Sequence, residues 1–406
     1  MADFAVSTHP GVQAQLDRLH MISPAGDRLG LTRIGEILER LGRPQDSLPP
    51  IFHVAGTNGK GSTIAMLRAA LEGAGLKVHA FTSPHLVRFN ERIRVAGELI
   101  EDDALEGLLV EILDCSDGIE PSFFEVATAA AILAFARNSA DACLLEVGLG
   151  GRLDATNIID RPLVSAIASI GIDHQQYLGI TLAEIAAEKA AIARADVPLV
   201  ALAQPAEAEA AIIAVAAEAG APLLLEGRDW TLDRALIPAL PGAHQMRNAN
   251  LAWQMLAAQD VFGVAHDDFV ASLKRVNWPA RLQRLGDGPL AGGKETWIDG
   301  AHNGEAAAAL ADYLTAAGSM HLVLGILANK DAGEIIGLLK PHALSLTFVP
   351  VPDHEHHDPA DLAKRFGGKT AKSLAEALKK LPAPRLVAGS LYLAGAALAA
   401  NKEAPD

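Results

Sequence analysis

The stretch Ile51–Thr63, with the sequence IFHVAGTNGKGST, constrains this chain more than any other. The apolar run Ile51–Ala55 predicts a strand, a glycine-containing turn follows, and Ser62–Glu72 has apolar residues at helical spacing. Glycines let the backbone approach phosphate oxygens closely, and the N-terminus of a helix attracts anions. A strand, a glycine loop and a helix in this order therefore predict a phosphate-binding loop.

The polar residues of this loop favour nucleotide binding. Lys60 adds a full positive charge, and Ser62 and Thr63 offer hydroxyls to phosphate or magnesium. The general P-loop pattern has Ser or Thr directly after the lysine, whereas Gly61 stands there in this chain. An ordinary turn between a strand and a helix is the alternative interpretation, but Lys60 and the paired hydroxyls argue against it.

Composition narrows the class of protein. The chain has 406 residues, which predicts two or three domains, and its net charge of −15 argues against nucleic acid or an anionic membrane as the main partner. The only cysteines, Cys115 and Cys143, have no neighbours at metal-ligand spacing, and Cys143 is expected to be buried. Neither a signal peptide nor a membrane-spanning run of about 18 apolar residues is recognisable. We therefore predict a cytoplasmic protein.

Strand-like and helix-like segments alternate along the chain. Asp141–Val147 is apolar on both faces, which is typical of a parallel strand covered by helices. The alternation predicts an α/β fold with a doubly wound, mostly parallel sheet. A segment rich in glycine and proline at 277–294 indicates a linker or hairpin, and a second α/β series starts at Thr296. We predict a P-loop domain at 1–285 and a smaller Rossmann-like domain at 286–406.

Polar side chains follow several of the predicted strands. In an open parallel sheet, ligands bind at the carboxyl ends of the strands. The residues at those ends are Lys60 and Ser62, Ser83 and His85, Glu146 and Arg152, and Asp173 and His174. Each alone could be an ordinary cap or turn. Together they predict a site for phosphates and one or two Mg²⁺ ions, which prefer few protein ligands plus phosphate and water.

Three further features allow two interpretations. Lys189 lies among apolar residues of a predicted helix, and this spacing is typical of a surface lysine with a buried stem. Asp299–Asn303 is either a turn or a segment that closes over the nucleotide. The run Asp353–Asp358 has the composition of a metal cluster, but its side chains are too close in sequence to converge easily, so we favour a surface loop.

These motifs resemble the folate branch of the Mur ligase superfamily, namely folylpolyglutamate synthase and dihydrofolate synthase. The resemblance covers nearly the whole chain, and Gly61 matches that family. The matching segments are Ala55–Ser62, Ser83–Leu86, Asn90–Ile93, Phe124-Glu125, Glu146–Asn157, Asp173-His174, Leu178-Gly179, Glu188–Ala190, His244-Gln245, Asn248-Ala249 and Asp299–Asn303. One departure is Pro279-Ala280 before Arg281, where the family often has an aromatic residue or glycine.

The resemblance implies a reaction. ATP would phosphorylate a carboxylate, and the amino group of L-glutamate would attack the acyl phosphate to give an amide, ADP and phosphate. ATP and Mg²⁺ are the implied cofactors. The implied substrates are dihydropteroate, reduced folates and L-glutamate. The resemblance also implies a monomer that binds neither nucleic acid nor a membrane. Asp27–Gly30 and Leu153–Ala155 favour a bifunctional enzyme. A monofunctional folylpolyglutamate synthase, or another Mur-type amide ligase, is the alternative.

The resemblance also implies roles for single residues, with Lys60, His174 and Lys189 as the catalytic ones. Gly59, Lys60, Gly61 and Ser62 would hold the phosphates, while Asn248, Arg281 and Asp299 would contact the nucleotide. Ser83, Glu146 and His174 would hold magnesium, and Lys189 would be carbamylated and hold a second ion. Arg28, Leu29, Gly30, Phe124, Leu153, Asp154 and Ala155 would line the pterin pocket.

Three other classes remain as rivals. A cell-wall Mur ligase usually has an extra N-terminal domain, for which about 50 residues before the loop leave little room. A P-loop kinase or NTPase would not need a second Rossmann-like domain. A binding module without activity would not be expected to keep Glu146, His174 and Asp299 at strand ends.

Overall fold

The computed structural model describes residues 5–23 and 29–405, and the chain divides into two compact units. The larger unit comprises Met1–Ala239 and Met246–Val276, and the smaller comprises Leu240–Gln245 and Asn277–Asp406. Residues 240–245 and 277–285 fall within the predicted P-loop domain but belong to the smaller unit. Those domain ranges stay predictions.

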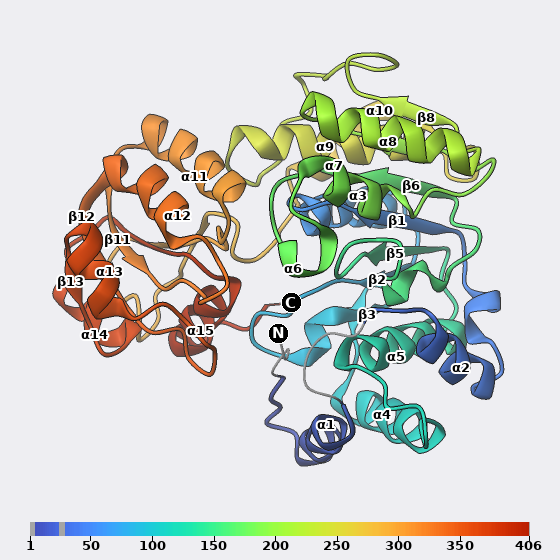
Figure 1. The fold of residues 1–406 in the computed structure, drawn as a ribbon, viewed down its shortest axis with the longest axis horizontal. Coiled ribbons are helices and arrows are strands. Elements are labelled where there is room, and N and C mark those ends of the chain that lie inside the picture. The colour runs from blue at the N-terminus through green and yellow to red at the C-terminus, as the bar shows by residue number, and fades with distance from the viewer. Residues whose placement is uncertain (1–4, 24–28, 406) are drawn as a thin grey trace. The chain divides into compact units, whose positions relative to one another are not determined.

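An eight-stranded sheet forms the centre of the larger unit, in the order β4-β3-β2-β5-β1-β6-β7-β8 (Figure 1). All neighbours pair in parallel except β3, which is antiparallel to β2 and to β4. The strands are β1 Ile51–Ala55, β2 Val78–Phe81, β3 Ile93–Val95, β4 Glu98–Leu99, β5 Ala142–Glu146, β6 Val164–Ile167, β7 Leu199–Ala201 and β8 Leu223–Leu225. Because β1 lies between β5 and β6, the loop after β1 has a strand end on each side.

Helices cover both faces of this sheet. Ile51, His53 and Ala55 share one face of β1, and the helices α4, α5, α7 and α8 pack over the apolar residues of that face. Helices α3 and α10 pack against each other, and α3 contacts β1, β2 and β5. The helices are α1 Pro10–Ile22, α2 Thr32–Arg40, α3 Lys60–Gly73, α4 Asp102–Cys115, α5 Phe123–Arg137, α6 Gln175–Leu178, α7 Leu182–Ala190, α8 Ala206–Ala219, α9 Ala243–Ala257 and α10 His266–Leu273.

The smaller unit has a six-stranded sheet in the order β13-β12-β11-β14-β10-β9, parallel except for β9. Its strands are β9 Gln283–Arg284, β10 Thr296–Ile298, β11 Met320–Leu324, β12 Ala343–Phe348, β13 Lys369–Thr370 and β14 Arg385–Ala388. Its helices are α11 Gly304–Ala317, α12 Ala332–Leu339, α13 Pro359–Phe366, α14 Leu374–Lys380 and α15 Leu391–Asn401. The predicted fold class is confirmed, and the segment 277–294 enters a hairpin formed by β9 and β10.

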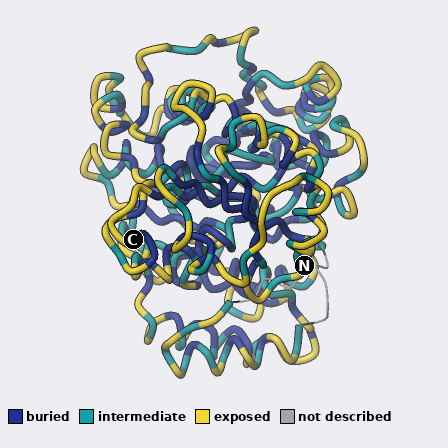
Figure 2. The backbone as a smooth tube through the Cα atoms, turned by 90° about the vertical axis from the view of Figure 1, so that its left-hand side faces the viewer, coloured by how far each residue is buried: buried dark blue, intermediate teal, exposed yellow. Residues whose placement is uncertain are grey.

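Burial follows this layering, since β1, β2, β5 and β6 are buried along their whole length. Figure 2 shows buried backbone in dark blue in the interior and exposed backbone in yellow along the outer turns. Cys143 in β5 is fully buried, as expected. In the part of the chain that the structure describes, no helix combines the length and apolar character needed to cross a membrane.

Candidate active site

The loop after β1 has the shape that a phosphate site needs. Gly59 has φ +89° and caps the N-terminus of α3, so the first turn of that helix faces the loop. The ammonium group of Lys60 folds back and donates to the carbonyl oxygens of Gly56 at 3.1 Å and Thr57 at 3.3 Å. The hydroxyl of Thr63 donates to the carbonyl oxygen of Gly59 at 2.9 Å. Hydrogen bonds within the loop thus hold its shape, and the ammonium group of Lys60 lies against the loop.

Hydrogen bonds tie this loop to the segment after β6. Thr57 N–H donates to the carbonyl oxygen of Ser169 at 2.7 Å, and the Thr57 hydroxyl bonds with both backbone groups of Gly171 at 3.0 Å. The Ser169 hydroxyl donates to the carbonyl oxygen of Asn58 at 3.2 Å. His174 follows Gly171 by three residues and has φ +50° at the start of α6. The phosphate loop and the segment that carries His174 are therefore held side by side.

Asn248 lies against the phosphate loop from α9. Its side chain is buried, and its amide oxygen occupies the place that a Cβ on Gly59 would take. The predicted nucleotide residues Gly59 and Asn248 are thus neighbours within the larger unit. This contact and the positive φ explain why residue 59 is a glycine.

Replacing Gly59 with alanine is expected to lower ADP affinity at least ten-fold, measured by calorimetric titration. A side chain at φ +89° costs about 1–2 kcal/mol, and here the new methyl group also displaces Asn248. Gly75→Ala is the matched control, because Gly75 has φ +84° but no heavy atom within 4 Å of the added Cβ. Equal losses of affinity in both variants would contradict the explanation.

A buried carboxylate lies beside the phosphate loop. Glu146 ends β5, is 4% exposed, and aligns with Val54 of β1 in the sheet. One of its carboxylate oxygens accepts a hydrogen bond at 3.1 Å from the backbone N–H of Ser83, which follows β2. The structure thus brings Glu146 and Ser83 together next to β1. Oxygen atoms of this kind beside a phosphate site are ligands that Mg²⁺ prefers.

Lys189 is not a surface residue, so the interpretation from helical spacing alone was wrong. It is 4% exposed on α7, and its ammonium group donates to the carbonyl oxygen of Gly56 at 3.0 Å. Lys60 donates to the same oxygen, so the two ammonium nitrogens are at most about 6 Å apart. Spacing identified α7 as amphipathic, but it could not show that the phosphate loop would lie over this helix.

The glycine loop at residues 148–151 joins several predicted site residues. An added Cβ on Gly148 would overlap the ring of Phe124, and one on Gly150 would lie 2.8 Å from the side chain of Leu178. One on Gly151 would lie 2.6–2.7 Å from the carbonyl oxygens of Glu188 and Lys189. The loop therefore packs directly between α5, α6 and α7, the helices that carry or border the predicted site.

The predicted pterin residues gather partly around this loop. Gly30, next to Leu29, donates from its backbone N–H to the carbonyl oxygen of Leu153 at 3.2 Å, and Ala155 opens the short helix that follows Asp154. Phe124 is the second residue of α5 and lies inside a capping box in which Ser122 and Glu125 bond to each other's backbone N–H groups. Arg28 lies outside the described residues.

Asp154 lies in the predicted pterin pocket, but its carboxylate is fully used within the protein. It is 1% exposed and accepts hydrogen bonds from Leu149 N–H at 2.8 Å, from Thr156 N–H at 3.0 Å and from the Thr156 hydroxyl at 2.5 Å. Burial raises the pKa of Asp154 above its ordinary value, and these hydrogen bonds offset only part of that rise. Asp154 therefore holds the surrounding loop in place through its hydrogen bonds to Leu149 and Thr156.

Arg281 and Asp299 lie together in the smaller unit. The Asp299 carboxylate accepts hydrogen bonds at 2.8 Å from Leu282 N–H and Ala301 N–H. Burial raises the pKa of Asp299 above its ordinary value, and the nearby Arg281 offsets only part of that rise. Ala280 has φ +56°, a conformation that glycine adopts more easily, which accounts for the glycine that the resembled family often has in this segment.

His53 is a buried residue of the site region that sequence reasoning missed. It is 1% exposed in the middle of β1, and its Nε2 lies 2.8 Å from the hydroxyl of Thr156. Burial, and next the positive charge of Arg194, lower the pKa of His53 to about 3. The sequence signal for His53 is a histidine within an apolar strand segment directly before the phosphate loop.

The low pKa of His53 predicts acid sensitivity. Between about pH 6.5 and 3 the unfolded chain binds a proton at this imidazole and the folded chain does not. The free energy of unfolding is therefore unaffected by His53 above pH 6.5, and it falls by about 1.4 kcal/mol for each pH unit between 6.5 and 3. Urea unfolding of the wild type and of His53→Gln at pH 7 and pH 5 measures this, and equal slopes against pH in the two proteins would contradict it.

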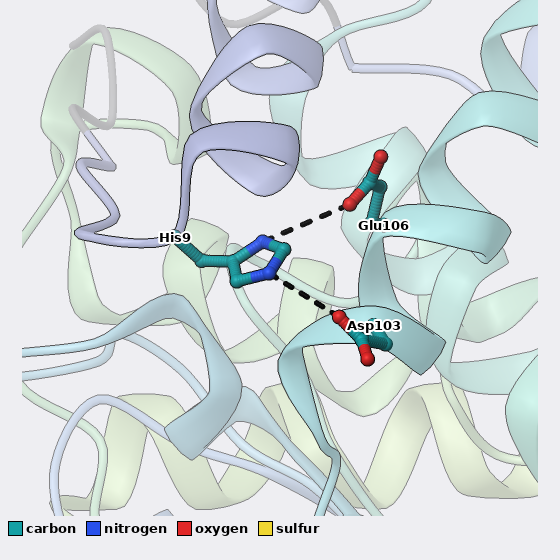
Figure 3. Close-up of side chains that lie close together, drawn as sticks. All are labelled: His9, Asp103 and Glu106. Atoms are coloured by element: carbon teal, nitrogen blue, oxygen red, sulfur yellow. Dashed lines mark ion pairs between the residues drawn. The ribbon is translucent and has the colours of Figure 1, made fainter.

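Another cluster of metal-type side chains joins α1 to α4. Within the described residues, one group of three converges in this way: His9 before α1, with Asp103 and Glu106 on α4 (Figure 3). The Nε2 atom of His9 is 3.2 Å from Asp103 and Nδ1 is 3.7 Å from Glu106. Each carboxylate lies at a different ring nitrogen of His9, so the group links the start of α1 to α4.

The histidine-rich run at 353–358 keeps its interpretation as a surface loop. The imidazole nitrogens of His354, His356 and His357 lie 2.7–2.8 Å from the backbone carbonyl oxygens of Pro352, His354 and Lys330 respectively. His354 also stacks on the ring of Tyr392, with the centroids 3.8 Å apart. These contacts hold the imidazoles apart, each on its own partner.

Comparisons with known proteins agree with this geometry. The chain is 35% identical over 357 residues to the Bacillus subtilis dihydrofolate synthase/folylpolyglutamate synthase, covering 80% of this chain and 81% of that protein. It superposes with a TM-score of 0.86 and 30% identity on Escherichia coli FolC in complex with DHPP and ADP, covering 97% of both chains. The Yersinia pestis bifunctional enzyme complexed with AMPPNP and Mn ion gives 0.86 and 29%, covering 97% and 98%. No family model matches the chain.

A phosphate loop at the centre of a doubly wound sheet, followed by a second α/β unit, defines an ATP-dependent ligase with the two-domain Mur ligase fold. Within that class the relatives are specific and cover most of the chain. The chain belongs to the dihydrofolate synthase/folylpolyglutamate synthase family.

Proposed function

We propose that this chain joins L-glutamate to dihydropteroate and also to the glutamate tail of reduced folates, using ATP. The names of the Bacillus subtilis and Escherichia coli relatives carry both activities. The observation that carries the proposal for this chain is the meeting of three groups at and beside the end of β1. These are the phosphate loop after β1, the buried Glu146 against Ser83, and the buried Lys189 on Gly56.

The residues fit activation of a carboxylate by phosphorylation. A carboxylate is a poor electrophile, and transfer of the γ-phosphoryl group of ATP to its oxygen creates an acyl phosphate with phosphate as the leaving group. The positive charge of Lys60 and the N–H groups at the start of α3 hold the nucleotide phosphates against their repulsion of the acid. The amine of L-glutamate, with a reference pKa of about 8, loses its proton before it attacks the acyl carbon.

Ser83, Glu146 and His174 are the residues that we assign to magnesium. The ion would neutralise phosphate charge there. The Mn ion in the Yersinia pestis relative supports a divalent cation. Asn248 is assigned to the nucleotide through its position on Gly59. Arg281 and Asp299 stay predicted nucleotide contacts, and a carbamate on Lys189 is part of the proposal.

The acceptor acid is assigned to the glycine loop and its neighbours. Phe124, Leu153 and Ala155, with Leu29 and Gly30, would provide the pterin pocket, and Asp154 would shape it through its backbone contacts. The complex of Escherichia coli FolC with DHPP supports a site for such a ligand in this family. A cytoplasmic location is also proposed, supported by two cysteines that are both free thiols.

One assay tests the proposed function. ADP release is measured with dihydropteroate and, separately, with tetrahydrofolate, each with and without L-glutamate. The bifunctional proposal expects glutamate-dependent ADP release with both acids. Activity with tetrahydrofolate alone would assign a monofunctional folylpolyglutamate synthase, and no glutamate dependence with either acid would overturn the proposal.

A further inference from the structure

The buried imidazole of His53 has no part in the chemistry described so far. It lies on the strand that leads into the phosphate loop, on the sheet face that α5 and α7 also cover. A polar group that is buried without a hydrogen bond costs free energy, so its partner matters. That partner is the Thr156 hydroxyl, 103 residues further along the chain.

The direction of the hydrogen bonds follows from the donors available. The Thr156 hydroxyl donates its single proton to Asp154 Oδ1, which also accepts from the Thr156 N–H. The hydroxyl oxygen must then accept from His53, so the imidazole carries its proton on Nε2. The result is one ordered relay, from His53 through Thr156 to Asp154. The low pKa of His53 keeps the imidazole neutral near pH 7, and the hydrogen bond to Thr156 fixes which ring nitrogen carries the proton.

The relay ends on the loop that borders the predicted pterin pocket. Asp154 Oδ2 holds Leu149 N–H, within the glycine loop at 148–151, while Oδ1 holds both polar groups of Thr156. The glycine loop in turn packs against the ring of Phe124 and the backbone of Lys189. A shift of Asp154 would therefore affect the acid site first, because the phosphate loop is held by Thr63 and by its hydrogen bonds to Gly171.

We propose that His53 and Thr156 are positioning residues for the acceptor acid, which hold Asp154 and the loop at 148–155 in the shape that the pterin requires. This inference rests on the proposed function and adds to it a specificity-determining pair outside the ligand pocket. The pair acts on the acid and leaves nucleotide binding unchanged.

The test separates KM for the acid from KM for ATP. Thr156→Val keeps the volume and removes the hydroxyl, whereas Thr156→Ser keeps the hydroxyl. We expect Thr156→Val to raise KM for dihydropteroate at least ten-fold with KM for ATP changed less than two-fold, and Thr156→Ser to restore KM for dihydropteroate to within about three-fold of wild type. Ser116→Ala, which removes a buried hydroxyl bonded to Ile112 at the end of α4, is the control and should change neither constant.

A second pair of variants decides the question if Thr156→Val does not fold. His53→Gln retains an N–H donor and should keep KM for dihydropteroate near wild type, while His53→Leu should raise it like Thr156→Val. An unchanged KM for the acid in Thr156→Val and His53→Leu, or an equal rise in KM for ATP, overturns the inference. Wild-type enzyme assayed in parallel keeps the two proposals apart, because loss of the proposed function would remove its glutamate-dependent turnover as well.

Discussion

Replacing Lys60 with alanine is expected to abolish ATP turnover, with kcat reduced at least about 1,000-fold, while the fold stays intact. The ammonium group lies over the phosphate loop, bonded to the carbonyl oxygens of Gly56 and Thr57. With nucleotide bound, it would be the main fixed positive charge that offsets the phosphates while the acid approaches. Removing one preorganised charge at a phosphoryl-transfer site costs several powers of ten in rate. ADP release with dihydropteroate and L-glutamate measures the loss.

The control for this variant is another lysine of the same unit. Lys77→Ala removes an exposed lysine just before β2, outside the proposed site, so turnover should stay within about two-fold of wild type. Circular dichroism and the unfolding temperature establish that Lys60→Ala is folded. A folded Lys60→Ala protein that turns over ATP at near the wild-type rate would exclude the assigned role of Lys60.

Local patterns predicted most of the fold. The helices Phe123–Arg137 and Ala206–Ala219 are of this kind, because their apolar residues stand at helical spacing within the segment itself. The helix Pro10–Ile22 was missed although Val12, Leu16 and Leu19 stand at helical spacing, since its first residues carry an unusual histidine cap. The hairpin of β3 and β4 was also missed, where Ala96 and Gly97 both have positive φ.

The candidate site was less predictable because its contacts are long-range. The glycines, Lys60 and the end of each apolar run can be read from neighbouring residues. They predicted the phosphate loop and the position of Glu146 at a strand end. The burial of Lys189 depends on Gly56, 133 residues earlier, and the partner of His53 is Thr156. Such pairs depend on which strands become neighbours, and no local pattern encodes that. For Lys189 the family resemblance indicated more than spacing did.

The Lys189→Ala variant is expected to be inactive, with kcat reduced at least about 1,000-fold, and to be rescued in part by small carboxylates. Lys189 and Lys60 both donate to the carbonyl oxygen of Gly56, so two cations would lie at most about 6 Å apart, one of them on the buried Lys189. Such a pair repels strongly where water is excluded. Addition of CO₂ to the neutral amine, with release of a proton, gives a carbamate, which replaces a cation by an anion.

The rescue experiment distinguishes a carboxylate role from a structural one. Acetate or formate enters the space left by the side chain and supplies the oxygens that the carbamate would supply, so turnover of Lys189→Ala should rise with carboxylate concentration and saturate. The same salts should restore nothing in Lys60→Ala, because that variant lacks a cation. Lys189→Ala that is active without any addition would contradict the assignment. An unmodified Lys189 in an active crystal with magnesium bound would exclude the carbamate, since the amine would then be the functional form.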